Sequence, residues 1–123
     1  MRVLVVDDDD IHLLILKRIF EKSNHLVVTA NNGLEALKVL ETDKGFSIIL
    51  TDIMMPIMDG IEFLVHLKKN VVSSGIPVIG FTSGDVEYYR KMSPIAFDSL
   101  VSKPLDFFDL YNLAKLKVDT RMN

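Results

Sequence analysis

Side chains that can do chemistry follow four apolar segments of the chain, at the point where each segment ends. In chain order they are Asp7 with Asp8, then Asp52, then Thr82 with Ser83, and finally Lys103. In an open parallel sheet, ligands bind in the crevice outside the carboxyl ends of the strands. If these segments are neighbouring strands, three carboxylates, a hydroxyl and an ammonium meet in one crevice.

Three carboxylates held close together repel one another, and a hard divalent cation removes that repulsion. Mg²⁺ prefers one or two carboxylates, several waters and a phosphate oxygen to a cage made only of protein. We expect Asp8 and Asp52 to be direct ligands, with Asp7 acting through water or as a third ligand. The cofactor predicted from these residues is therefore Mg²⁺.

Such a site favours phosphoryl transfer, in which the protein supplies positioning and charge stabilisation. Asp52 is the expected nucleophile and forms an aspartyl phosphate. Thr82 and Lys103 are expected to contact the phosphoryl oxygens, the first by its hydroxyl and the second by its charge, with Ser83 beside them.

Each of these residues also has an ordinary structural interpretation. The acidic run 7–10 is typical of a solvated segment that caps a helix, and Asp52 and Thr82 are typical capping residues. Lys103 stands between an apolar strand and a proline, where capping does not explain it. The combination of all four segments favours the phosphoryl site over capping.

The elements that position these residues alternate along the chain. Strands are expected at 2–6, 26–30, 48–50, 76–81 and 99–102. Helices are expected from Asp10 as a cap, after Gly33, after Gly60 to about Asn70, at 86–92 and from 107 to 118. Five alternations predict an α/β, flavodoxin-like (βα)5 three-layer sandwich with a parallel five-stranded sheet of order 2-1-3-4-5.

Composition limits the function classes. The 123 residues are 49% hydrophobic and 25% charged, which predicts one domain over 1–118 with a short tail at 119–123. A net charge of −3 without a basic stripe argues against direct binding of nucleic acid. The absence of cysteine excludes disulfides, thiolate metal sites and cysteine nucleophiles. No signal peptide and no apolar run near the roughly 18 residues of a membrane span are present, so we expect a cytoplasmic chain without membrane contact.

Over about residues 2–118, these motifs resemble the receiver domain of two-component response regulators. Asp7 and Asp8 match the metal-binding pair of that family, and residues 51–60 resemble its phosphoacceptor loop, with Asp52 as the phosphorylated aspartate. Thr82 matches the switch hydroxyl and Lys103 the lysine that precedes a proline.

The resemblance implies Mg²⁺ held by the acidic pair, by Asp52 and by the backbone carbonyl of Met54. It implies that Asp52 accepts a phosphoryl group from a phosphohistidine on a sensor histidine kinase or a histidine phosphotransfer protein. Thr82 then moves inward, and the face formed by the last two helices and the last strand changes shape. The chain is expected to catalyse only its own phosphorylation and dephosphorylation. No role is expected for His12, His25 or His66.

The sequence departs from the family at the second switch position. The family commonly has an aromatic residue three positions before the lysine, and here that position is Leu100. The switch is then either smaller or uses Tyr88, Tyr89 or Phe97.

The loop 82–86 contains Gly84, so we expect it to be mobile without phosphate. Neither Met54 nor Gly84 has a side chain that orients an attacking water, which predicts a long-lived phosphoryl group.

Two other functions compete with the signalling switch. Asp7 and Asp9 form the Asp-x-Asp pattern of haloacid-dehalogenase-like Mg²⁺ phosphatases, although the chain length and its late acidic residues fit that family poorly. The other alternative is an interaction module that never gains phosphate. The sequence leaves open the kinase, the target, and whether the chain is a stand-alone regulator or part of a longer one. A weak dimer is the alternative to a monomer, with apolar surface at Leu105, Phe107 and Phe108.

Overall fold

The computed structural model describes residues 1–102 and 106–122; Lys103 and Leu105, both named above, lie outside them. Five strands alternate with five helices in this part of the chain. In chain order they are β1 (Arg2–Val6), α1 (Asp10–Lys22), β2 (Leu26–Ala30), α2 (Gly33–Thr42), β3 (Ile48–Asp52), α3 (Gly60–Lys69), β4 (Val78–Thr82), α4 (Val86–Met92), β5 (Ser99–Ser102) and α5 (Phe107–Met122).

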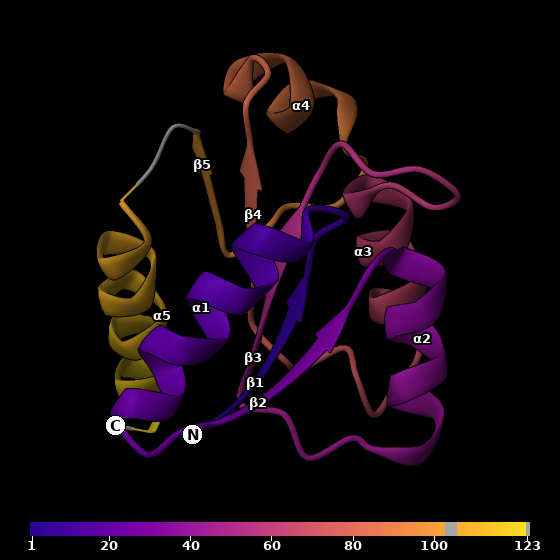
Figure 1. Ribbon diagram of the computed structural model, residues 1–123. Coiled ribbons are helices and arrows are strands. Elements are labelled where there is room, and N and C mark those ends of the chain that lie inside the picture. Colours follow the sequence, from indigo (N-terminus) through magenta and orange to yellow (C-terminus); the bar gives the residue numbers. More distant parts are fainter. Residues whose placement is uncertain (103–105, 123) are drawn as a thin grey trace.

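The strands form one parallel sheet of order β2-β1-β3-β4-β5, which confirms the predicted topology. Figure 1 shows α1 and α5 on one face of the sheet, α2 and α3 on the other, and α4 beyond the end of β4. The register sets Val6 beside Thr51 and Asp52 beside Phe81, so the carboxyl ends of β1, β3 and β4 lie nearly level.

Apolar side chains fill both sides of the sheet, as a parallel sheet covered by helices requires. Leu4 and Ile49 point into a cluster with α2 and α3, and their neighbours Val3 and Ile48 point into a second cluster with α1 and α5. The continuous apolar runs in the sequence are therefore strands that bury alternate residues in two separate cores.

Several predicted boundaries differ from the structure; β3, for example, extends to Asp52 rather than ending at residue 50. Asp9, not Asp10, caps α1, because its side chain accepts the N–H groups of Ile11 and His12. β4 begins at Val78 rather than at residue 76, since Pro77 has no N–H to donate to the sheet. α5 runs to Met122 instead of ending at residue 118, because no glycine or proline interrupts the chain there.

Among the described residues, no helix combines the length and the apolar character that crossing a membrane requires.

Candidate metal centre and phosphoacceptor site

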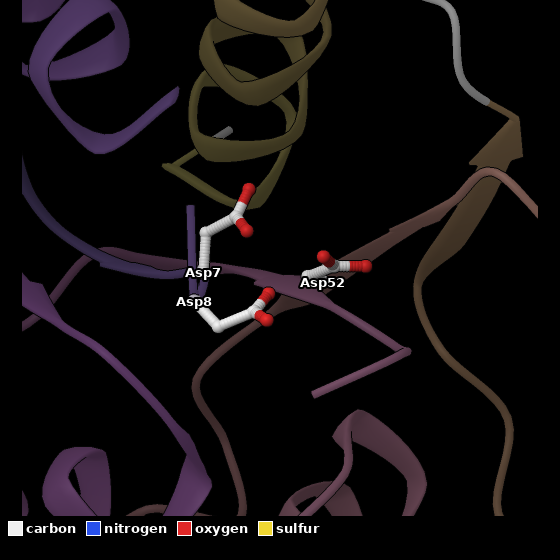
Figure 2. Close-up of side chains that lie close together, drawn as sticks. All are labelled: Asp7, Asp8 and Asp52. Atoms are coloured by element: carbon white, nitrogen blue, oxygen red, sulfur yellow. The ribbon is translucent and has the colours of Figure 1, made fainter. Parts of the chain in front are cut away.

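Three carboxylates gather at the carboxyl end of the sheet (Figure 2). Asp7 and Asp8 follow β1 directly, and Asp52 is the last residue of β3. Each carboxylate offers one oxygen atom, and these three oxygen atoms all lie within 4.8 Å of one another. This geometry confirms the prediction that the three side chains meet. The pairing of β1 with β3 brings them together.

Burial separates these residues from an ordinary acidic run. Asp7 is fully buried and Asp52 is 5% exposed, whereas Asp8 is open to solvent. The interpretation of 7–10 as a merely solvated segment is therefore wrong for Asp7, and the cap of α1 is Asp9 instead of the expected Asp10. Buried carboxylates are costly unless hydrogen-bonded or paired with a cation, so the site is built to receive positive charge.

Local backbone geometry holds the two buried carboxylates. The N–H of Asp9 donates to Oδ1 of Asp7 over 3.0 Å, and the N–H of Met54 donates to Oδ1 of Asp52 over 3.3 Å. Gly60 closes the loop after β3, where its N–H donates to the carbonyl of Ile53 over 2.8 Å. A Cβ on Gly60 would lie 2.5 Å from the carbonyl oxygen of Asp52, so only glycine fits there.

Thr82 is the last residue of β4 and is fully buried. Its Oγ1 accepts the N–H of Gly84 over 3.0 Å. Ser83 is exposed, and Lys103 lies outside the described residues. The proposed roles of these residues toward phosphate stay predictions, as does that of the Met54 carbonyl.

Leu100, at the second switch position, packs into the interior. It is 9% exposed, and its Cδ1 lies 2.9 Å from the point that a Cβ on Gly80 would occupy. Phe97 lies against the same point at 3.0 Å. Leu100 and Phe97 therefore pack together against Gly80 of β4.

Sequence reasoning missed one residue at this site. Nδ1 of His12 lies 3.1 Å from Oδ2 of Asp7, and its Nε2 lies 3.4 Å from Oδ2 of Asp9. The other two histidines lie elsewhere: His25 contacts the N-terminal amino group and Tyr111, and His66 is exposed on α3. The sequence pattern gave no signal for this contact, because it depends on how α1 is rotated against the sheet.

The donor set fits a hard divalent cation. Carboxylate oxygens are the ligands that Mg²⁺ takes, and it keeps an open side for water and phosphate. Asp7, Asp8 and Asp52 supply such oxygens from two strands, with Asp8 on the solvent side. The described site contains no thiolate, and this hard oxygen set favours Mg²⁺ over softer metals.

Comparison with known proteins identifies the class. The chain matches the response regulator receiver domain family over residues 3–115. It therefore belongs to this family and is the receiver domain of a two-component response regulator. The match favours the receiver interpretation over the haloacid-dehalogenase-like alternative.

Individual relatives agree with this assignment. The chain is 35% identical over 104 residues to the alkaline phosphatase synthesis transcriptional regulatory protein PhoP of Bacillus subtilis, covering 84% of this chain and 42% of PhoP. It is 35% identical over 123 residues to the CpxR homolog of Haemophilus influenzae, covering 98% of this chain and 51% of that protein. The chain thus spans about half or less of these relatives.

Solved receiver domains share the whole fold. A receiver domain of Francisella response regulator 1452 superposes with a TM-score of 0.86 at 28% identity, covering 99% of this chain and 98% of that one. The signal receiver domain of a histidine kinase from Syntrophus aciditrophicus gives a TM-score of 0.87 at 27% identity, covering 97% of this chain and 90% of that one.

Proposed function

We propose that this domain is a phosphorylation-activated switch whose phosphoacceptor is Asp52. The observation that carries the proposal is the convergence of Asp7, Asp8 and Asp52 at the end of the sheet. Asp52 combines near-complete burial with a place beside two further carboxylates. A structural cap needs neither property.

In the proposed reaction, a carboxylate oxygen of Asp52 attacks the phosphorus of a phosphohistidine on the partner. The O–P bond forms while the P–N bond breaks, and the electron pair of that bond returns to the imidazole nitrogen. Asp8 and Asp52 would hold Mg²⁺ with help from Asp7, and the ion would neutralise charge on the phosphoryl oxygens. Lys103, which lies outside the described residues, is proposed to contact the same oxygens.

The switch is proposed to start from Thr82. Its hydroxyl oxygen accepts the N–H of Gly84 in the described state. The phosphoryl group would carry about 1.5 to 2 negative charges in place of the single charge of the carboxylate, and it would bring new acceptor oxygens toward Thr82. The hydroxyl would then donate to a phosphoryl oxygen, the loop 82–86 would rearrange, and the face made by α4, β5 and α5 would change shape.

The partner is proposed to be a histidine kinase or a histidine phosphotransfer protein that docks on α1. This helix begins directly after the acidic pair and exposes three apolar side chains on its outer surface, namely Ile11, Leu14 and Ile15. Their exposed fractions are 68%, 48% and 37%. An apolar stripe beside a reaction centre suits a helical partner that carries the reacting histidine.

The chemistry of the domain is proposed to be limited to its own phosphorylation and dephosphorylation. The loss of phosphate is expected to be slow, because Met54 and Gly84 offer no side chain that orients water. Incubation with a generic phosphoester tests the first point: sustained release of phosphate would contradict it.

The central test compares Asp52→Asn with Asp59→Asn. Asp59 caps α3 through the N–H of Glu62, and asparagine preserves such a cap, so the second variant is a matched control. Each protein is incubated with Mg²⁺ and acetyl phosphate and weighed by intact mass spectrometry. We expect one added phosphoryl group on the wild type and on Asp59→Asn, and none on Asp52→Asn. Equal labelling of all three proteins would sink the proposal.

A further inference from the structure

His12 connects three parts of the molecule around the acidic site. It sits in the first turn of α1, its Nδ1 contacts the carboxylate of Asp7 at 3.1 Å, and its ring meets the ring of Phe107 edge-on at 5.3 Å. Phe107 is the first residue of α5. One imidazole therefore links α1, a carboxylate of the site and the start of the last helix.

The contact with Asp7 has a consequence for how that carboxylate is oriented. Asp7 is fully buried, and the N–H of Asp9 donates to one of its oxygens, Oδ1. Nδ1 of His12 lies against the other oxygen, Oδ2. With a partner on each oxygen, the carboxylate cannot rotate without breaking one of them.

Helix capping does not account for the side chain of His12. Asp9 already accepts the N–H groups of Ile11 and His12, so the first turn of α1 is capped by another residue. Surface solvation does not account for it either, because less than a third of the His12 side chain is exposed. The imidazole is instead held by the carboxylate of Asp7 at Nδ1, by that of Asp9 at Nε2 over 3.4 Å, and by the ring of Phe107.

We infer that His12 is a positioning residue for the proposed cation site: it donates from Nδ1 to Asp7 and fixes the direction in which that carboxylate faces Asp8 and Asp52. This inference rests on the proposed function of the site. Groups that orient the ligands of a metal typically change its affinity by 10- to 100-fold when they are removed. The contact with Phe107 further implies that the position of α5 and the occupancy of the site affect each other.

The test measures Mg²⁺ binding to the unphosphorylated protein by isothermal titration calorimetry, at one fixed pH. His12→Leu removes the donor but keeps an apolar side chain against Phe107, whereas His12→Asn keeps an N–H donor near the position of Nδ1. His66→Leu is the matched control, because that histidine is exposed on α3 away from the site. We expect an affinity about 10-fold weaker for His12→Leu, and near wild type for His12→Asn and His66→Leu.

Unchanged Mg²⁺ affinity in His12→Leu, with saturable binding to the wild type, would overturn the role of His12 and leave the proposed function standing. Absence of saturable Mg²⁺ binding to the wild type would overturn both.

A second measurement uses the wild type alone and does not depend on any variant folding. During a Mg²⁺ titration followed by NMR, the ring-nitrogen resonances of His12 should shift with the midpoint found by calorimetry, while those of His66 stay fixed. Ring resonances of His12 that do not respond to saturating Mg²⁺ would contradict the inference.

Discussion

The ring of Tyr89 lies over Gly84, with its Cε2 atom 2.8 Å from the point that a Cβ on Gly84 would occupy. Gly84 in turn donates its N–H to Oγ1 of Thr82. A short path of contacts thus runs from the buried hydroxyl of Thr82 through the loop after β4 to an aromatic ring on α4. Since Leu100 occupies the position where receivers commonly carry the aromatic switch, Tyr89 is the aromatic side chain best placed to respond to Thr82.

This relationship predicts the effect of Gly84→Ala. The added methyl group overlaps the Tyr89 ring and forces it away, because the glycine leaves no room for a Cβ. We expect the Tyr89 resonances of the unphosphorylated variant to move toward those of the phosphorylated wild type. NMR of the aromatic rings measures this, with Tyr111 on α5 as the internal reference. Tyr89 resonances that are the same before and after phosphorylation of the wild type would rule out the coupling.

Substitution of the exposed stripe on α1 should separate docking from chemistry. The double variant Ile11→Ser with Ile15→Ser removes apolar contact area beside the site without touching Asp52. We expect transfer from a phosphohistidine protein to slow at least about 5-fold, which corresponds to roughly 1 kcal/mol lost at an interface.

Phosphorylation of the same variant by acetyl phosphate should be unchanged, because the small donor needs no docking surface. Val71→Ser is the control, since Val71 is 90% exposed in the loop after α3, away from α1. Equal slowing with both donors would mean that the stripe serves the fold or the site rather than a partner.

Acid should destabilise the fold partly through His25. Burial, the N-terminal amino group and Lys115 lower the pKa of His25 below its ordinary value of about 6.5. The unfolded chain therefore binds a proton more readily, and stability falls as pH drops below about 6.5 toward the lower folded value. His25→Gln should flatten the loss of unfolding free energy between about pH 7 and pH 5. Urea melts at each pH measure it, and parallel curves for the two proteins would refute the assignment.

The substitutions Gly60→Ala and Gly75→Ala should have very different effects on the stability of the fold. Gly60→Ala places a methyl group 2.5 Å from the carbonyl oxygen of Asp52, whereas a Cβ on Gly75 meets nothing within 4 Å. We expect Gly60→Ala to lower the free energy of unfolding by about 1–3 kcal/mol and to reduce phosphorylation of Asp52. Gly75→Ala should leave both near wild type. Similar stabilities for the two variants would show that the loop after β3 tolerates a side chain.

The strands and their order in the sheet could be predicted from the sequence, because they rest on the pattern of apolar residues. The apolar runs ending at Val6 and before Asp52 predict buried parallel strands, and the level ends of such strands bring their acidic residues together. The contacts of His12 with Asp7 and of Tyr89 with Gly84 were not accessible, because they depend on how a helix is rotated against the sheet. The choice of Asp9 over Asp10 as cap was equally hidden, since two adjacent acids satisfy the same pattern.

Pairing of β1 with β3 means that no single segment of the chain contains the acidic cluster. Asp8 and Asp52 stand more than forty positions apart, and only a completed central sheet sets them side by side. A chain still emerging from the ribosome, or one whose middle strand has come loose, therefore lacks the proposed cation site. The proposed phosphoacceptor site therefore forms only when the central sheet has folded.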